Sequence, residues 1–280
     1  MNIYVNGDSF TAGAELTDWV LPGFPGYGTT GHRDGFWEVP KETKAWYRTK
    51  HYVAIKHFGS IENRETTEKN LAWPAELGKL DPTLFVYNGS AAGASMTGIT
   101  HRTVADLLTF KAKDIAFDQV FIQLTGCHRF EIYDSTMIQK KFIIDKPFGW
   151  IDTLPGRTQQ ELGKCYIAQY KNEDLAIKFL YNLCTLKQAV KGLTGHNPII
   201  LSSLSLFTTG VIDPLKNNPD PLIQLLLKES GILDILPEYC MEIVHRDNNF
   251  LYCPGMHFEH RTHQAYAKII YNKYINYDTQ

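Results

Sequence analysis

The chain has 280 residues, of which 44% are hydrophobic, so it is long and apolar enough to bury a large core. Its 28 Lys and Arg residues against 30 Asp and Glu residues give a net charge of -2. This balance gives no electrostatic reason to expect a nucleic acid or an acidic membrane surface as a partner. The five cysteines are scattered, odd in number and without CxxC spacing, which argues against a disulfide framework or a zinc ribbon and favours a reducing compartment.

No apolar run approaches the roughly 18 residues of a membrane span, and no basic and apolar leader precedes the first predicted strand. We therefore expect a cytoplasmic protein without membrane insertion. The sequence does not indicate an oligomeric state.

Short β-branched and aromatic runs predict five buried parallel strands, at residues 3–5, 84–87, 120–124, 199–201 and 250–252. Helical patterns lie between and after them, at residues 73–80, 100–110, 174–190, 221–228 and 259–275. Because strands and helices alternate, we expect a three-layer α/β fold with right-handed crossovers.

Three segments are longer than ordinary connections: residues 14–71, 127–172 and 205–249. We interpret them as loops that shape a site within a single domain spanning residues 1–280. The first is rich in Gly, Pro and aromatic residues at positions 21–28, which suits a binding rim, an oligomer contact or a disordered flap.

The strongest chemical signal is the octapeptide Asn-Gly-Asp-Ser-Phe-Thr-Ala-Gly at residues 6–13, directly after the first predicted strand. Ligands of open parallel sheets bind at the carboxyl ends of the strands, which is where Ser9 lies. Gly7 permits a tight turn whose outward amides can stabilise an oxyanion. The alternative is that Asp8 or Ser9 only caps the following helix.

Gly7, Asp8, Ser9 and Gly13 match the first block of the SGNH/GDSL hydrolases, and the octapeptide resembles that family. The resemblance implies a flavodoxin-like sheet of five parallel strands in the order 2-1-3-4-5, with helices on both faces. It also implies that Ser9 is the nucleophile and that its amide is one donor to the oxyanion.

The second block of the family resembles the segment from Asn88 to Gly93, in which Gly93 takes the place of an oxyanion donor. Considered apart from the first block, the same residues would be interpreted as a plain glycine-rich turn between a strand and a helix. Small residues there allow a substrate to approach backbone amides closely.

The third block departs from the family pattern, because Gly126 matches but Cys127 stands where an oxyanion Asn is expected. A thiol is a poor hydrogen-bond donor, and the loss of one side-chain donor costs about 2.7–4 kcal/mol of transition-state stabilisation. Thr125 or His128 can replace that donor; otherwise activity is modest.

The pattern Thr-x-x-x-Arg-x-Glu at residues 125–131 is similar to a variant of the family that is common in bacteriophage and bacterial genomes. We expect Arg129 and Glu131 to form an ion pair that holds the loop. The alternative is that they bind substrate.

The last block of the family, Asp-x-x-His, resembles the segment Pro254–His257, in which His257 matches the general base and Pro254 replaces the acid. Loss of the acid is severe where a triad depends on it. Three readings stay open: a dyad oriented by a backbone carbonyl, a carboxylate from elsewhere, or little catalysis. The candidate carboxylates are those of Glu238, Asp247 and Glu259.

Two other readings of these residues are weaker. His257, His260 and His263 recur at spacings of three and could share a helix face as metal ligands, but no familiar ligand pattern accompanies them, so we predict no metal and no cofactor. Cys127 could act as a nucleophile beside His128. Adjacent residues on an extended loop point apart, so we expect these two side chains to be separated.

The sequence thus predicts a serine-dependent ester hydrolase acting through Ser–His acyl-enzyme chemistry on a small-molecule or glycan ester. The aromatic residues of the long segments (Trp37, Trp46, Tyr47 and Trp150) offer stacking faces for a sugar ring and favour carbohydrate O-deacetylation. The rival hypothesis is a catalytically weak or inactive SGNH domain that binds a glycan or a protein, and a second rival is a metal-dependent enzyme.

Overall fold

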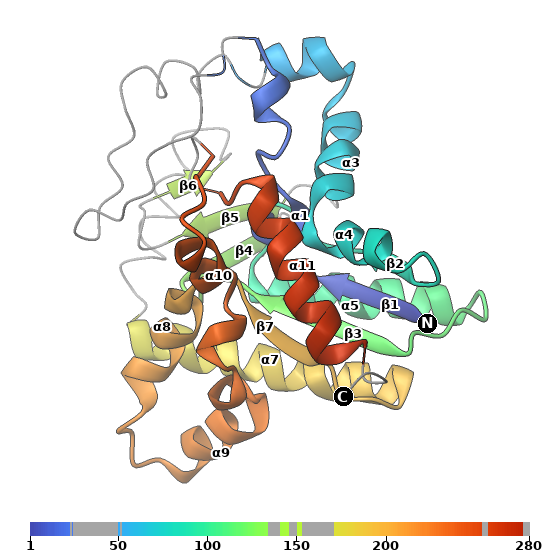
Figure 1. The fold of residues 1–280 in the computed structure, drawn as a ribbon. Helices are drawn as coiled ribbons and strands as arrows, with labels where there is room; N and C mark the ends of the chain where they lie inside the picture. The colour runs from blue at the N-terminus through green and yellow to red at the C-terminus, as the bar shows by residue number, and fades with distance from the viewer. Residues whose placement is uncertain are drawn as a thin grey trace.

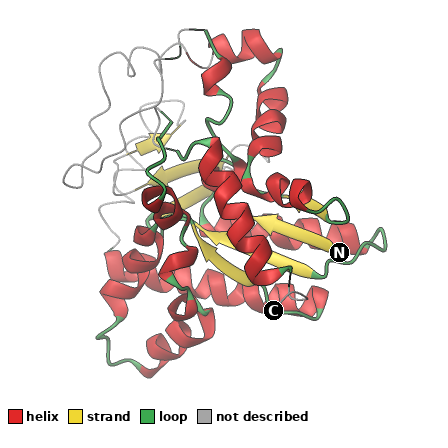
Figure 2. Ribbon diagram, viewed as in Figure 1, coloured by secondary structure: helices red, strands yellow, loops and turns green. Residues whose placement is uncertain are grey.

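The structure is a computed structural model that describes residues 1–22, 24, 50, 52–133, 141–145, 150–152, 171–253 and 257–276. It has an α/β architecture in which helices flank a parallel sheet (Figures 1 and 2). The strands of the parallel sheet are β1 (Asn2–Asn6), β2 (Phe85–Asn88), β3 (Gln119–Leu124) and β7 (Ile199–Ser202). The longer helices are α3 (Ile61–Leu71), α4 (Trp73–Leu80), α5 (Met96–Lys111), α7 (Asn172–Thr194), α8 (Ser205–Leu215), α9 (Pro221–Ser230) and α11 (His260–Tyr274).

The parallel sheet has the order β2-β1-β3-β7, with β1 and β3 in its interior. Tyr4 of β1 pairs in register with Tyr87 of β2 and Val120 of β3. The predicted strands at residues 3–5, 84–87, 120–124 and 199–201 are therefore confirmed, and they lie in the first four places of the expected order. Their predicted burial holds for β1 and β3, whereas β2 is half-buried to exposed and β7 is buried only in its second half.

The predicted fifth strand, at residues 250–252, is wrong: the described part of the chain contains four parallel strands. Tyr252 instead forms a single antiparallel bridge with Phe258. The backbone amide of Leu251 donates to the Glu259 carboxylate at 2.7 Å, and that of Cys253 donates to the carbonyl of His257 at 2.8 Å. These local partners take amides that a fifth strand would need for its ladder.

Helices cover both faces of the sheet. α4 and α11 lie on one face (Figure 1). There the Trp73 indole packs edge-on against Phe121 of β3 and Tyr266 of α11. α5 and α7 lie on the other face, and the hydroxyl of Tyr4 donates to Asp106 of α5 at 2.9 Å. Because both faces are covered, the central strands are apolar along most of their length, which made them readable from the sequence.

The described parts of the three long segments contain helices and strands, which corrects their interpretation as loops. Residues 205–249 contain α8, α9, α10 (Met241–Asp247) and the short 3-10 helices η2 (Ile232–Asp234) and η3 (Pro237–Tyr239). Phe207, Val211 and Leu215 recur every four residues and are buried, so α8 carries a helical pattern despite Pro214 inside it.

Residues 127–172 contain a second, antiparallel sheet with the order β4-β5-β6, formed by β4 (Arg129–Tyr133), β5 (Lys141–Asp145) and β6 (Trp150–Asp152). Residues 14–71 contain α3 and the 3-10 helix η1 (Asp18–Val20). None of the helices in the described part of the chain has the length and apolar character needed to cross a membrane.

Candidate active site

Ser9 begins the short helix α1 (Ser9–Ala12), directly after the carboxyl end of β1. The turn between them is tight, because a Cβ on Gly7 would lie 2.1 Å from the hydroxyl oxygen of Thr11. Gly13 ends the helix in the left-handed region, with φ of 72°. These two glycines bring Ser9, which is 7% exposed, to the edge where the loops of the sheet converge.

Asp8 is the N-cap of α1, so the capping interpretation is confirmed for this residue. Its side chain accepts a hydrogen bond from the amide of Phe10 at 3.1 Å and forms an ion pair with Arg129 at 3.2 Å. Burial raises the pKa of the Asp8 carboxyl above its usual value, and the Arg129 guanidinium and the Phe10 amide oppose that rise. Arg129 therefore joins the loop after β3 to the Ser9 turn. The side chain of Glu131, its predicted partner, lies outside the described residues.

The Asn88–Gly93 loop lies beside the Ser9 turn. The Asn88 side-chain amide donates to the carbonyl of Thr11 at 3.1 Å, and the amide of Ala91 donates to the carbonyl of Gly7 at 3.4 Å. Asn88 also accepts a hydrogen bond from the hydroxyl of Ser90. Gly93 has a φ of 73°, a conformation that favours glycine. The structure thus brings together the two loops that hold the predicted oxyanion donors.

The loop after β3 differs from the extended loop that we expected. The amide of Arg129 donates to the carbonyl of Gly126 at 3.1 Å, which closes a tight turn. In this turn the Cys127 sulfur lies 3.0 Å from Nδ1 of His128, so the expectation that these side chains point apart is wrong. Thr125 is buried, and its hydroxyl is one of the groups that lower the pKa of Asp8.

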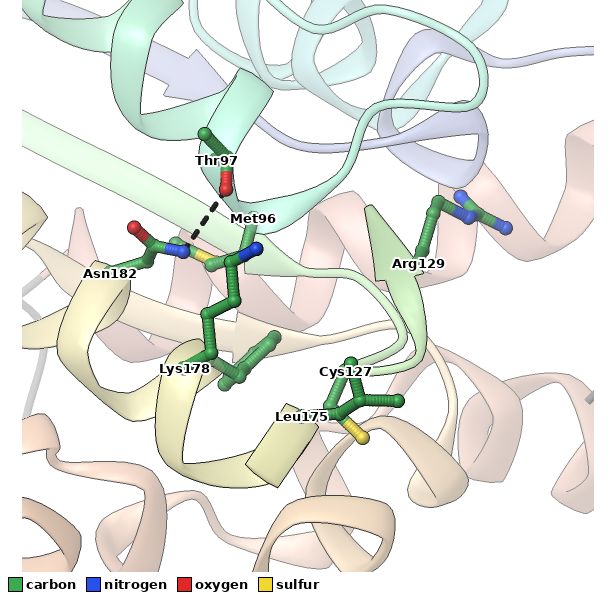
Figure 3. Close-up of a pocket in the computed structure, with 8 residues that line it drawn as sticks. Met96, Thr97, Cys127, Arg129, Leu175, Lys178 and Asn182 are labelled. Atoms are coloured by element: carbon green, nitrogen blue, oxygen red, sulfur yellow. Dashed lines mark hydrogen bonds between the residues drawn. The ribbon is translucent and has the colours of Figure 1, made fainter. Parts of the chain in front are cut away.

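A small pocket lies behind this turn, between the start of α5 and the first half of α7 (Figure 3). The Asn182 side-chain amide donates to the hydroxyl of Thr97 at 3.0 Å along one wall. The pocket is lined by Met96, Thr97, Cys127, Arg129, Leu175, Lys178, Phe179 and Asn182. Neither Ser9 nor His257 lines this pocket, so it is distinct from the Ser9 turn. Arg129, which lines the pocket and pairs with Asp8, connects the two.

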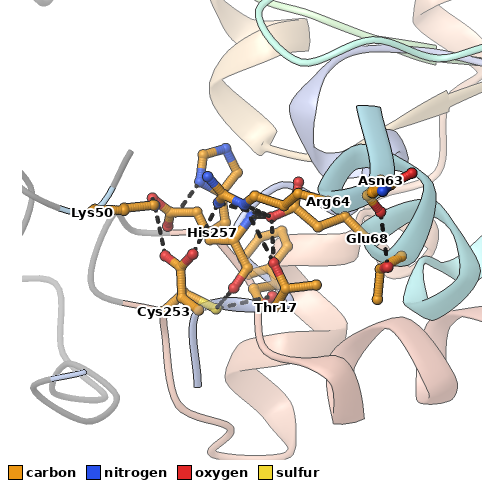
Figure 4. A network of polar contacts seen from close by, with 11 residues as sticks. Thr17, Lys50, Asn63, Arg64, Glu68, Cys253 and His257 are labelled. Carbon is orange, nitrogen blue, oxygen red and sulfur yellow. Dashed lines mark hydrogen bonds and ion pairs between the residues drawn. The ribbon is translucent and has the colours of Figure 1, made fainter. Parts of the chain in front are cut away.

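His257 lies between the Ser9 turn and a buried carboxylate. Its ring centroid lies 5.0 Å from that of Phe10, the residue after Ser9. Its Nδ1 lies 3.1 Å from Oε2 of Glu15 (Figure 4). The hydrogen bond from Cys253 to the His257 carbonyl closes the turn that positions this ring. Pro254, the residue in the place of the family's acid, lies outside the described residues.

Glu15 is the functional candidate that the sequence analysis missed. It follows Ser9 by six residues, its side chain is buried, and it adopts the left-handed region with φ of 72°. Among the acids that we had considered, Glu238 and Asp247 are exposed. Glu259 instead accepts from the Leu251 amide and pairs with Arg261 at 2.8 Å.

The three neighbouring histidines have separate partners. Nε2 of His260 lies 2.9 Å from the Glu76 carboxylate, and Nδ1 of the buried His263 accepts from the amide of Trp73 at 3.1 Å. Within the residues that the structure describes, no group of three His, Cys, Asp or Glu side chains is arranged to hold a metal ion.

We expect His263 to make stability depend on pH. Burial lowers its pKa from 6.5 to about 3, with smaller contributions from the nearby histidines. A histidine with a lowered pKa stays neutral in the folded state, so stability is lost as pH falls from 6.5 toward 3. Between pH 7 and pH 4 this loss is about 3 kcal/mol in the free energy of unfolding, measured by urea denaturation.

The matched variant is His263→Asn, because its side-chain oxygen can still accept from Trp73 but does not titrate. Its stability should fall less steeply with acid than that of the wild type. A residual slope is expected from His245, whose pKa burial lowers to about 4. Equal slopes in the two proteins would contradict the assignment.

No protein-family model matches the chain, and no curated protein matches it in sequence.

Proposed function

We propose that this protein is a serine-dependent carboxylic ester hydrolase of the SGNH type, with Ser9 as nucleophile and His257 as general base. The placement of His257 is the observation that carries the proposal. Its ring packs on Phe10 beside Ser9, and its Nδ1 lies 3.1 Å from the buried Glu15 carboxylate. An imidazole beside a buried carboxylate, next to a turn that carries a serine, supports a catalytic triad of Ser9, His257 and Glu15.

In this mechanism His257 takes the proton of the Ser9 hydroxyl as its oxygen attacks the ester carbonyl. Glu15 holds the imidazole with its proton on Nδ1 and stabilises the imidazolium that forms. The alcohol leaves with a proton returned by His257, and water then releases the acyl group from Ser9 by the same steps.

The amides of Ser9 and Gly93 are the proposed oxyanion donors. In the part of the chain that the structure describes, neither amide donates to another residue, and the two loops that carry them are hydrogen-bonded to each other. Thr125 lies against Asp8, which favours a role in fixing the Ser9 turn over a role as third donor. With two amide donors and no Asn at position 127, we expect modest rates.

The sheet supports the family proposal at the level of the fold. Four parallel strands in the order β2-β1-β3-β7 are compatible with a flavodoxin-like arrangement, in which the site lies at the carboxyl ends of the strands. A carbohydrate acetyl ester remains the substrate that we favour, on the sequence alone. Trp37, Trp46 and Tyr47 lie outside the described residues, as does the side chain of Trp150.

The test is labelling of the purified protein with a fluorophosphonate probe, which reacts with activated serines. We expect labelling of the wild type and loss of labelling in both Ser9→Ala and His257→Ala, because the hydroxyl is activated only when the imidazole can take its proton. A wild-type protein that is not labelled would favour the glycan- or protein-binding function instead.

A further inference from the structure

Behind His257, five charged side chains form a network that is largely buried and that the reaction above uses only through Glu15 (Figure 4). Nζ of Lys50 lies 2.9 Å from Oε1 of Glu15 and 2.6 Å from Oδ2 of Asp18. Arg64 lies 2.9 Å from Asp18 and 2.9 Å from Glu68. Arg64, at 14%, has the most exposed side chain of the five, so these pairs are poorly screened by solvent.

The network also fixes the backbone of Glu15. The amide of Glu15 donates to Oε1 of Glu68 at 2.9 Å, and its carbonyl lies 3.8 Å from the Cys253 sulfur. A residue other than glycine in the left-handed region carries a conformational cost, which persists only where the surroundings hold it. Glu15 is therefore held in place through its backbone amide and through Oε1 of its carboxylate, while Oε2 faces Nδ1 of His257.

The described side chains of the network are three acids, Glu15, Asp18 and Glu68, and two cations, Lys50 and Arg64. When His257 takes a proton from Ser9 in the proposed reaction, the positive charge that it acquires lies beside the Glu15 carboxylate. An ionised Glu15 therefore stabilises the protonated imidazole.

Lys50 has a particular place in this arrangement, since its single ammonium group contacts the carboxylates of both Glu15 and Asp18. Paired carboxylates without a cation share a proton, because two like charges at short range are costly. Burial raises the pKa of Asp18 to about 6 even beside Lys50, and the charge of Glu15 adds to the rise. The Asp18 carboxylate is therefore close to taking up a proton at neutral pH.

We propose that Lys50 is a positioning residue for the reaction: it keeps Glu15 ionised and aimed at His257 by separating it from Asp18. The inference rests on the proposed function of Ser9 and His257. It adds that the pairing of Glu15 with Lys50, rather than the mere presence of Glu15, decides whether the imidazole is held in its active form.

The experiment compares the full-length wild type with Lys50→Met, Lys50→Arg, Asp18→Asn and the double variant Lys50→Met/Asp18→Asn. The rate of fluorophosphonate labelling is measured from pH 6 to pH 9, together with the melting temperature. Lys216→Met is the matched control, because Lys216 forms an exposed ion pair with Asp213 on α8.

At pH 7 we expect Lys50→Met to be labelled about 10- to 100-fold more slowly, since a proton shared with Asp18 turns Glu15 away from His257. Its labelling should recover as pH rises and the shared proton is lost. The double variant should regain at least about 10-fold of the rate at pH 7, because the amide introduced at position 18 does not compete for a proton. Lys50→Arg and Lys216→Met should stay close to the wild type.

The pH dependence of the melting temperature detects the proton shared by Glu15 and Asp18 independently of any catalytic activity. In Lys50→Met the carboxyl pair has a raised pKa in the folded state, so stability should fall as pH rises from 5 to 8 relative to the wild type. The double variant should lack this fall.

A wild type that is labelled while Lys50→Met is labelled equally fast would overturn the inference and leave the proposed function intact. A double variant no faster than Lys50→Met would do the same. A wild type that is not labelled at all would remove the proposed function, and the role of Lys50 with it.

Discussion

Ser9→Ala should reduce hydrolysis of p-nitrophenyl acetate to the uncatalysed background, a loss on the order of 10⁴-fold or more in kcat/KM. The reason is that, in the proposed mechanism, Ser9 supplies the atom that forms the acyl-enzyme bond. The measurement is the rate of p-nitrophenolate release by wild type and variant at pH 7 to 8, with equal melting temperatures as evidence of folding.

Two further variants make this result specific. Ser205→Ala removes an exposed hydroxyl on α8 that bonds to Glu242 and should leave the rate unchanged. Cys127→Ala tests the other nucleophile, since the Cys127 sulfur lies 3.0 Å from His128. Activity that survives Ser9→Ala but disappears in Cys127→Ala would transfer the nucleophilic role to the thiol.

The parts of the fold that could be predicted from the sequence are those set by local pattern. The runs that form β1, β2, β3 and β7 are short and bounded by turn residues, which marks them as strands. They are largely apolar because helices cover both faces of the sheet. The Ser9 turn could also be recognised from local sequence. Gly7 stands where a side chain would clash with Thr11, and Gly13 adopts the left-handed conformation that ends α1.

The third block shows how a local prediction fails. We expected Cys127 and His128 to point apart because extended neighbours do so, but a tight turn from Gly126 to Arg129 brings their side chains together. Arg129 was predicted to hold this loop through Glu131, whose side chain lies outside the described residues. The structure shows a partner that was not predicted, Asp8, which is 121 residues away in the sequence. Partners at that separation leave no local signal.

The carboxylate of the site was missed for the same reason, and the fifth strand for a related one. Glu15 and His257 are far apart in the sequence, and nothing in the Gly-Ala-Glu segment at residues 13–15 marks a catalytic acid. The run at residues 250–252 has strand composition. The amide of Leu251 within it donates to the Glu259 carboxylate, and the amide of Cys253 directly after it donates to the His257 carbonyl. Tertiary context overrides propensity at such positions.

Glu15→Gln should lower kcat by about 10²- to 10⁴-fold with little change in KM. Gln has nearly the same size, so it can keep an oxygen toward Lys50, but it then presents an amide donor to Nδ1 of His257. The imidazole must place its proton on Nε2 to avoid two opposed donors. In that tautomer Nε2 cannot accept the proton of Ser9, so the nucleophile is not activated. Steady-state kinetics with p-nitrophenyl acetate measure both parameters.

Asp247→Asn is the matched control, because Asp247 was a candidate acid in the sequence and lies exposed at the end of α10. It should change kcat by less than about twofold, since an exposed carboxylate is screened by solvent. If Asp247→Asn were slow and Glu15→Gln were not, the contact between Glu15 and His257 would have no catalytic role. If both were fast, His257 would act as a dyad with Ser9. A slow Glu15→Gln variant with an unchanged KM would show that Glu15 does the work of the family's acid. That acid normally stands three residues before the histidine, where this chain has Pro254, whereas Glu15 stands six residues after Ser9.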